Sequence, residues 1–579
     1  MNLNQVNRTN VFLTRGSLGF GSFADFLLGM TAAQNGSNFS NISSSQIANG
    51  VVRAYPRFRN FSLFTQDDYR VNNQLTLNIG LRYQYNGDKT DKNGRIGGFD
   101  PNLVTPFLAP PPSGTFAGFT VVSNCGCTPP PGFTKVSSNS PIYNQNYLGF
   151  SPRVGLAYRP IARNENFVFR MGYGIFWSSV AGTVTEQSNF DPYYVWNRAG
   201  GADLASTSWQ NPFPNPPPAS SAFPIYLPYT LGSTRSTLPT DPYLKQPYTQ
   251  QWSASLQYNL SNFLLNLGYV GSASTHLIAG FNANQPLLAS PSNPVGGLTV
   301  NTVANRALRG PYLGWLPTGI SEYKSILTGQ YDALQFSVQC RFSSGLSFIA
   351  AYTWSHSIDT DGVSAGGRNE PLGSFSGDFY NTRSARGSSS FVRTQRLVVS
   401  YSYDIPRLKY GPALLQHAVN DWSLSGVTTI QSGLPFSVTD NTSGTIYGIS
   451  TYANFAAGKT PADAKLSGNA QSRLSQYFKT SVSTTAPVIG DGTGFGNAGR
   501  DILRGPGQLN FDSSIVRQFK VGGLSESGAV QIRGEFFNIA NHPQFNNPGS
   551  NRGAPSTFGV ISSAAVAPRI ILFALKYVF

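Results

Sequence analysis

Two overlapping stretches of the sequence carry residue types that could do chemistry. Ser355–Asp359 holds a serine, a histidine and an aspartate, which are the residue types of a hydrolytic triad. A triad is a three-dimensional arrangement of roles, and adjacency within one predicted strand does not supply it. Asp359–Gly362 has half of a calcium-binding loop and lacks the later ligands. The sequence therefore predicts no catalytic residue, no metal site and no enzyme.

The cysteines form a third candidate for chemistry. Cys125 and Cys127 are separated by one glycine, and a pair this close could bind a metal ion. However, no histidine or third cysteine lies near them, so a loop disulfide or two free thiols is the favoured interpretation. Cys340 alternates with apolar residues and is interpreted as a small hydrophobic side chain facing lipid. No cofactor is predicted.

Composition argues against an ordinary soluble protein. Aromatic residues make up 13% of the 579 residues and charged residues only 12%, about half the usual soluble share. No apolar run reaches the ~18 residues that a membrane helix needs. The net charge of +15 is scattered rather than clustered, so we predict no nucleic-acid partner. Phosphates of lipopolysaccharide suit these basic residues equally well.

The last strand of the chain gives the strongest local pattern. Ile571, Phe573, Leu575, Tyr577 and Phe579 occupy alternate positions, so they share one face of a strand. A strand of an outer-membrane barrel presents such a face to lipid. A terminal Phe preceded by alternating apolar residues also resembles the signal read by the barrel-assembly machinery. The alternative is the edge strand of a soluble sandwich.

Similar alternation recurs along the chain and predicts about thirteen strands, or about fourteen if the N-terminal segment contains one. The expected strands cover residues 61–71, 75–86, 154–158, 167–177, 252–260, 263–269, 334–342, 346–354, 397–405, 422–430, 511–519, 530–538 and 571–579. The connections within pairs are mostly short, whereas those between pairs are long. The long connections cover residues 88–152, 179–247, 275–330, 360–391, 439–509 and 542–568. This alternation indicates an all-β, antiparallel transmembrane β-barrel with short periplasmic turns and long extracellular loops.

The N-terminal segment, residues 1–54, is weakly patterned. One short helix is expected over residues 22–30, capped by Ser22 with Asp25 three positions later. Residues 1–16 contain no continuous apolar core and do not predict a signal peptide. We therefore divide the chain into residues 1–54, which contribute loop or short helix to the barrel, and a barrel over residues 55–579.

Several stretches resemble one family in the same order along the chain. They include FTQDDYRVNNQLTLNIGLRYQ (64–84), SPRVGLAYRP (151–160), FRMGYGIFW (169–177), WSLSGVTTIQSGLPFSV (422–438) and IRGEFFNIANHPQF (532–545). Together they resemble the C-terminal barrel of Oar-like TonB-dependent outer-membrane proteins.

The resemblance implies a cell outer membrane location in a Gram-negative bacterium, a plugged barrel of about 22 strands, and energy supplied through TonB. The sequence shows no plug pattern and no TonB box. About eight of the 22 strands (22 − 14) also have no counterpart. We therefore expect a C-terminal fragment whose wall is open, or is closed only with poor ladder pairing, with TonB engaged only through the missing N-terminal parts.

Polar residues on the inward-facing sides of the expected strands are candidates to line a lumen. These residues are Arg82, Gln84, Arg170, Gln257, Gln335, Gln339, Arg341, Arg533 and Glu535. The alternative is that they only hydrogen-bond to one another and to a plug.

The aromatic residues of the other face should form two belts. Tyr83, Trp177 and Trp354 are expected near the extracellular boundary, and Tyr577 and Phe579 near the periplasmic one. The first hypothesis for function is uptake of an unidentified substrate by a TonB-dependent receptor. The second is a surface structural or adhesion protein. Partners are outer-membrane lipid, lipopolysaccharide and the assembly machinery, the last through Phe573, Leu575, Tyr577 and Phe579.

Overall fold

The computed structural model describes most of the chain. The described residues are 2–5, 8–9, 15–50, 53–94, 97–104, 117–125, 128–129, 132–136, 147–161, 166–178, 194–199, 201–213, 240–315, 317, 319–342, 345–360, 373–374, 377–444, 446–447, 451–485, 495–521 and 528–578.

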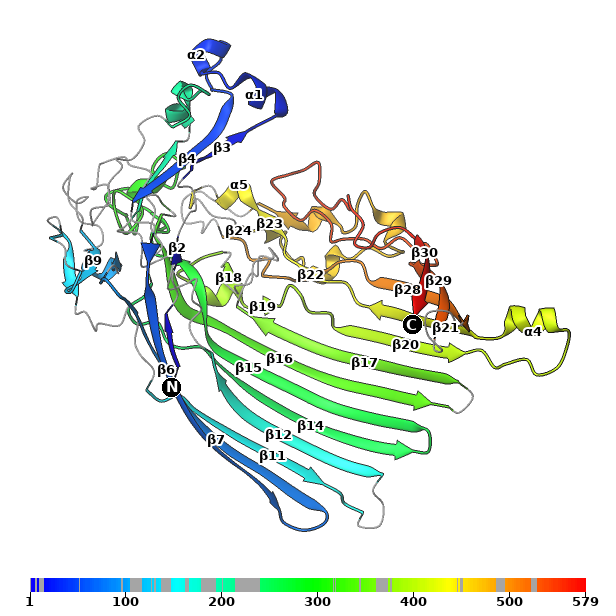
Figure 1. Ribbon diagram of the computed structural model, residues 1–579. Helices are drawn as coiled ribbons and strands as arrows, with labels where there is room; N and C mark the ends of the chain where they lie inside the picture. Colours follow the sequence, from blue (N-terminus) through cyan, green and yellow to red (C-terminus); the bar gives the residue numbers. More distant parts are fainter. Residues whose placement is uncertain are drawn as a thin grey trace.

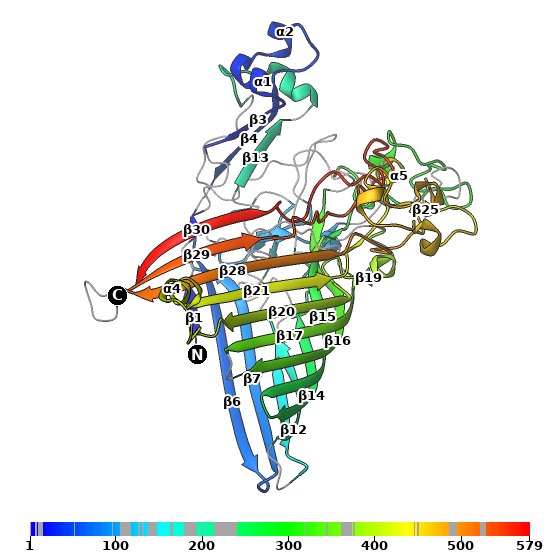
Figure 2. The same ribbon diagram turned by 90° about the vertical axis from the view of Figure 1, so that its right-hand side faces the viewer.

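One antiparallel sheet dominates the structure and curves like the wall of a barrel (Figures 1 and 2). Its main path has fourteen strands, and each pairs with the next one along that path. They are β1 (Asn2–Gln5), β6 (Pro56–Arg70), β7 (Leu75–Asp91), β11 (Phe150–Tyr158), β12 (Phe167–Trp177), β14 (Tyr248–Leu260), β15 (Phe263–Asn282), β16 (Ser321–Arg341), β17 (Leu346–Asp359), β20 (Gln395–Asp404), β21 (Trp422–Gln431), β28 (Gln508–Lys520), β29 (Ala529–Phe537) and β30 (Ile570–Val578). The predicted thirteen strands are confirmed, and β1 is the fourteenth, in the N-terminal segment.

The wall is open, which is the first of the two predicted outcomes. β1 pairs with β6 and β30 pairs with β29, and within the described part of the chain neither edge strand has a second strand partner. An open edge leaves a row of backbone N–H and C=O groups outside the ladder.

The connections alternate in length as predicted. Short connections join β6 to β7, β14 to β15 and β16 to β17 at one end of the wall, which we call the turn side. Long segments join the pairs at the opposite end, the loop side. Gly345 lies in the turn between β16 and β17 with a φ of 88°, a conformation that glycine adopts without strain. A Cβ atom there would also lie 2.8 Å from the carbonyl oxygen of Asp404.

The hairpin of β15 and β16 is longer than predicted. Residues 275–330 were expected to form a loop, yet β15 continues to Asn282 and β16 begins at Ser321. The pairing changes register between Ser274 and Leu277, where His276 has a φ of 61°. This irregularity interrupts the alternation of apolar residues, so the periodic pattern in the sequence ends earlier than the ladder does.

The loop-side segments form packed structure of their own. They contain β8 (Gly97–Phe99), η1 (Pro101–Leu103), β9 (Phe119–Val122), β10 (Thr134–Val136), η4 (Arg306–Leu308), β18 (Gly373–Ser374), η5 (Thr382–Ala385), β19 (Gly387–Ser388), β22 (Pro435–Phe436), β23 (Thr439–Asp440), α5 (Asn441–Gly444), β24 (Thr451–Tyr452), β25 (Asn454–Phe455), η6 (Pro461–Ala464), η7 (Gln471–Arg473), η8 (Thr480–Val482), β26 (Ser483–Thr484) and β27 (Leu503–Arg504).

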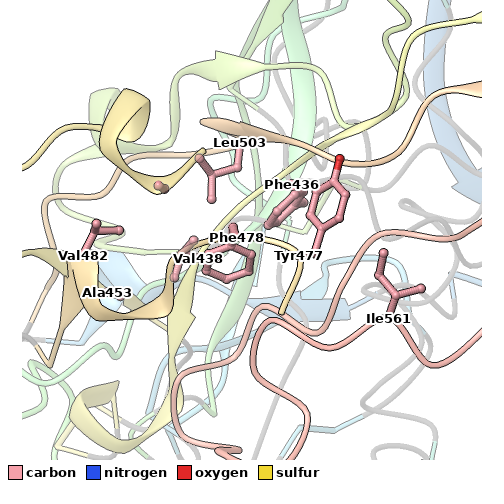
Figure 3. Packing of buried hydrophobic residues seen from close by; sticks show 9 residues of the cluster. Phe436, Val438, Ala453, Tyr477, Phe478, Val482, Leu503 and Ile561 are labelled. Carbon is pink, nitrogen blue, oxygen red and sulfur yellow. The ribbon is translucent and has the colours of Figure 1, made fainter. Parts of the chain in front are cut away.

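The largest apolar cluster of the loop side lies between β21 and β30 in the chain. Phe436, Val438, Phe478 and Leu503 are each less than 10% exposed there, and Ile561 joins them from the segment before β30 (Figure 3). Because these residues come from two connections, 432–507 and 538–569, they bind the two connections into one body. We call this body the loop cap.

The N-terminal segment forms an arm that rises on the loop side (Figure 1). The arm comprises β3 (Ser17–Phe20), α1 (Phe23–Leu28), α2 (Ala32–Asn35) and β4 (Ile42–Gly50), joined by β13 (Tyr194–Ala199) and η3 (Gly201–Ser206). The helix predicted over residues 22–30 is confirmed as α1. Its predicted cap is also present, because the Ser22 side chain accepts a hydrogen bond from the backbone N–H of Asp25. Below the arm, β2 (Arg8–Thr9) pairs with β5 (Arg53–Ala54).

The helices that the structure describes are short. None of them is both long enough and apolar enough to cross a membrane.

Candidate functional site

The strand register divides the wall into two chemically different faces. Cross-strand partners point to the same face of a sheet, so a row of partners defines a face. One row passes from Arg170 through Ser255 and Gly268 to Gln335. A second row passes from Arg341 to Glu535 through serines of β17, β20, β21 and β28. By this alternation all nine residues predicted to line a lumen lie on one face, which we call the polar face.

The opposite face is apolar and exposed. Ile79, Met171, Leu267 and Phe336 expose between 42% and 54% of their surface there, and Phe573 at the β30 edge exposes 81%. Within the described residues no protein layer covers this apolar surface, and lipid is the environment that suits it. We call this side of the wall the apolar face.

Neighbouring polar-face residues contact one another. Arg170 Nη1 donates a hydrogen bond to Gln257 Oε1 over 2.7 Å, and Arg533 Nε lies 3.4 Å from Glu535 Oε1. Arg82 donates to Ser62 Oγ, and Gln84 to Asn86 Oδ1. These contacts match the interpretation in which such residues hydrogen-bond to each other, while their role in lining a lumen stays a prediction.

A hollow of about 470 Å³ lies against β11, β12, β14, β15 and β16. One row of the polar face crosses it, from Arg153 through Gly174, Gln251 and Ser272 to Tyr331. The concavity arises at Gly174, because a Cβ atom there would lie only 3.1 Å from the Phe176 ring. We call this hollow the wall pocket.

The wall pocket combines three kinds of recognition group. The Arg153 guanidinium lies 4.8 Å from the centroid of the Phe176 ring, a cation–π contact that orients the cation. Gln251 adds an amide, and Ser272 and Tyr331 add hydroxyl groups. Aromatic surface with a few convergent polar groups is the usual composition of a small-molecule site.

None of these pocket residues was among the predicted site residues. The available signal was the sequence Met171-Gly172-Tyr173-Gly174, because it places two glycines on the polar side of a strand. Glycine at two successive positions of one strand face leaves space for a ligand.

Aromatic residues on the apolar face lie where neighbouring strands end. Tyr83 pairs with Phe150, the first residue of β11, and Trp354 pairs with Gln395, the first residue of β20. Trp177 is the last residue of β12, also on the loop side. Tyr577 pairs with Val530 on the turn side. These positions fit the two predicted belts, although Phe579 lies outside the described residues.

The stretches with possible catalytic or metal chemistry have other roles. Ser355 and His356 are consecutive in β17 and therefore point to opposite faces, and the Ser355 hydroxyl donates to the carbonyl of Arg393. Asp359 forms an ion pair with Arg500. In the described part of the chain no three His, Cys, Asp or Glu side chains gather as metal ligands. Asp361 and Gly362 lie outside it.

The cysteines have two different states. Cys125 is disulfide-bonded, which matches one of the two alternatives that the sequence left open, a loop disulfide or two free thiols, and Cys127 lies outside the described residues. Cys340 is free and buried. It pairs with Phe263 on one side and Phe348 on the other. The two aromatic neighbours explain why this apolar-face thiol is covered.

A buried carboxyl group lies at the loop end of β16. Glu322 is 1% exposed, and its Oε2 atom lies 2.9 Å from Lys324 Nζ. Burial raises the pKa of Glu322 to about 7, against the attraction of Lys324, with smaller increases from Asp241 and Asp100. The ionised carboxylate is therefore disfavoured in the folded loops.

Glu322 should make the loop side more stable in acid than in base. A folded pKa above the unfolded value contributes stability below pH 4.5 that is lost as the pH rises through 7. We expect the free energy of opening of the loops to be higher at pH 5 than at pH 8, by at most about 3 kcal/mol. Proteolysis of the loops on isolated outer membranes, corrected for the protease's own activity at each pH, measures this difference. Glu322→Gln should flatten this pH dependence, and an unchanged dependence in the variant would contradict the assignment.

Fold and faces together define the wall of a transmembrane β-barrel protein. The family described as outer membrane beta barrel domain matches residues 1–571, and the chain belongs to this family. The comparison with curated protein sequences found no match.

Solved structures with a similar arrangement are outer-membrane transporters and receptors. The outer membrane transporter YddB from Escherichia coli is 9% identical with a TM-score of 0.45, and the match covers 92% of this chain and 49% of YddB. The ferripyoverdine receptor of Pseudomonas aeruginosa is 9% identical with a TM-score of 0.38, covering 90% of this chain and 39% of the receptor. BauA, the ferric preacinetobactin receptor from Acinetobacter baumannii, is 11% identical with a TM-score of 0.35, covering 93% and 44%. The chain therefore spans about half the length of these proteins or less.

Proposed function

We propose that this chain forms the barrel wall in a TonB-dependent receptor that takes up a small substrate across the outer membrane. The observation that supports this proposal most strongly is the division of one fourteen-strand wall into an apolar face and a polar face, with packed loops at one end. A wall of this kind separates lipid from a polar interior through which a solute moves. Coupling to TonB would require a plug and a TonB box.

Three kinds of partner follow from the proposed function. Outer-membrane lipid and lipopolysaccharide contact the apolar face and its aromatic belts. The TonB system contacts the plug and the TonB box. The assembly machinery reads the C-terminal strand, where Phe573 and Leu575 expose 81% and 76% of their surface.

Uptake can be tested without knowing the substrate. This wall is produced together with a plug and a TonB box ahead of it in the outer membrane of a Gram-negative host, and cells with and without TonB are incubated in a complex nutrient extract. Mass spectrometry then measures which solutes are depleted. We expect depletion of at least one solute that needs both the protein and TonB. Depletion independent of TonB, or none, would contradict the proposal.

The wall pocket gives this assay a specific variant. Gly174→Val fills the pocket, because the added atoms meet Phe176 and Arg153 within 3.5 Å. We expect uptake to fall about tenfold, corresponding to about 1.4 kcal/mol of lost binding. Gly268→Val is the control, since it lies on the polar face of β15 outside the pocket with its nearest atom at 3.7 Å. Equal uptake by both variants would remove the pocket from the route.

The C-terminal signal is tested by deletion of Phe579. We expect this deletion to reduce the amount of protein assembled in the outer membrane several-fold, more than the lost apolar contact of one terminal side chain explains. Phe336→Ala removes apolar surface of similar size from the apolar face of β16, outside the C-terminal signal, and serves as the matched comparison. Equal assembly of the deletion and the parent would refute recognition of the terminal residue.

A surface structural or adhesion role is the second candidate. The arm favours it, because Phe23, Leu27 and Phe39 expose 73%, 64% and 70% of their surface at its tip on the loop side. Cells carrying the protein would then attach to one another or to surfaces, and Phe23→Ser with Leu27→Ser would abolish the attachment while leaving any uptake unchanged.

A further inference from the structure

The turn-side connection between β20 and β21 contains a helix. α4 (Ala413–Val419) lies in the segment 405–421 and projects beyond the turn-side ends of the two strands (Figure 1). On the same side, Ser261–Asn262 joins β14 to β15 without a helix. The extra length of this connection therefore has another purpose than joining the strands.

α4 is amphipathic, and its apolar side is uncovered. At about 100° per residue, Leu414, Leu415, Ala418 and Val419 fall on one side of the helix, with Gln416 opposite. Leu414 is 86% exposed and Leu415 is 48% exposed. Tyr410, just before the helix, is also 86% exposed. An exposed apolar stripe of this size marks a contact surface.

Two residues of the apolar face of the wall hold α4 in place. Trp422 and Arg517 are cross-strand partners in a row that continues to Ile532 and Leu575, both of the apolar face. Trp422 Nε1 donates a hydrogen bond to the carbonyl of Ala418 over 2.8 Å, and Arg517 Nη2 donates to the carbonyl of His417. These carbonyls are in the last turn of the helix, where they need donors and attract a cation.

α4 therefore continues the apolar surface of the wall past the end of the strands. Arg517 also lies 5.7 Å from the ring centroids of both Trp422 and Phe519. An Arg beside aromatic rings at the end of a membrane strand places its charge at the level of the lipid headgroups.

The charges around α4 suit an anionic surface. Lys409 precedes the helix, and Arg517 of β28 donates to the carbonyl of His417 in its last turn. Arg407 is already paired with Asp421, over 2.6 Å. The unpaired excess is therefore positive, as in helices that lie on phospholipid.

We propose that α4 lies in the headgroup layer of the turn-side leaflet, with Leu414 and Leu415 in the acyl region and basic groups at the phosphates. The ligand is a phospholipid surface rather than a single lipid molecule. Two observations select this occupant: the helix is attached to the lipid-facing side of the wall, and its surroundings are basic. The proposal does not depend on whether the barrel transports a substrate.

The depth of two labelled positions tests the proposal. Leu415→Cys and Ala413→Cys point about 200° apart around the helix axis. Each is made in the full chain with Cys340→Ala, because Cys125 is disulfide-bonded and does not compete for the label. An environment-sensitive fluorophore is attached, and the protein is placed in bilayers of phosphatidylethanolamine and phosphatidylglycerol. The parent with Cys340→Ala alone gives the background labelling.

The expected result is a contrast between the two positions. The probe at 415 should emit at shorter wavelength and be quenched by nitroxide on the upper acyl chain, while the probe at 413 should be quenched by aqueous iodide. Equal iodide quenching at both positions would overturn the proposal. A probe at 415 that is shielded from both quenchers would also overturn it and would indicate a protein partner. Both positions are exposed, so neither label disturbs a buried contact.

Discussion

Arg500→Met is expected to lower the free energy of opening of the loop cap and the segments beneath it by about 3–5 kcal/mol. The Arg500 side chain is 2% exposed, forms an ion pair with the Asp359 carboxylate, and donates Nη1 to the carbonyls of Asp359 and Ala385. Asp359 ends β17, whereas Arg500 belongs to the connection between β21 and β28. Removal of the guanidinium takes this cation away from two buried carboxylates, those of Asp359 and Asp501, and the loss of these two ion pairs is the main cost.

Proteolysis of the loops on intact outer membranes measures this effect. Lys459→Met is the matched control, because it removes an exposed cation from the same connection as Arg500. The control should cost less than about 1 kcal/mol. Adding Asp359→Asn to Arg500→Met should recover part of the loss, since the buried Asp359 charge is removed while that of Asp501 remains. If all three variants are cleaved at the parental rate, Arg500 does not tie the cap to the wall.

The wall was predictable from sequence because a two-residue period repeats along each strand. In β12 the predicted and observed bounds, Phe167 to Trp177, coincide. The fourteen-strand path, the turn and loop sides and the polar face follow from the same alternation and from the spacing between strands. The ladder of β15 and β16 exceeded its prediction, because the irregularity at His276 breaks the period while the pairing continues.

The site was less predictable, because long-range contacts define it. The wall pocket depends on five strands from a span of nearly 180 residues (331 − 153 = 178) meeting in one register row. The sequence separates Arg153 from Tyr331 and does not show that they share a hollow. The loop cap was equally hidden, since its buried residues come from Pro-, Gly- and Ser-rich connections without a period.

β6 shows why even a strand pattern can mislead. Asp67 pairs with Ile79 and therefore lies on the apolar face, within an alternation that the sequence already showed to be imperfect. An arginine at Ile79 would find a carboxylate partner there, which would lower its cost in lipid. A test of the two faces needs a site with apolar neighbours on both sides.

Leu267 provides that site. It pairs with Leu256 on β14 and Phe336 on β16 and is 42% exposed. It lies four residues after Phe263, the turn-side start of β15. Leu267→Arg is expected to cost about 2–4 kcal/mol, because it places a charge among lipid chains. The adjacent Asn266 pairs with Gln257 and Ser337 on the polar face, so Asn266→Arg should be mild. The measurement is the folded fraction of each variant in phospholipid bilayers as urea is raised. Both substitutions introduce arginine, and the two positions are adjacent. An equal loss of stability at Asn266 and Leu267 would therefore show that the two faces have been assigned wrongly.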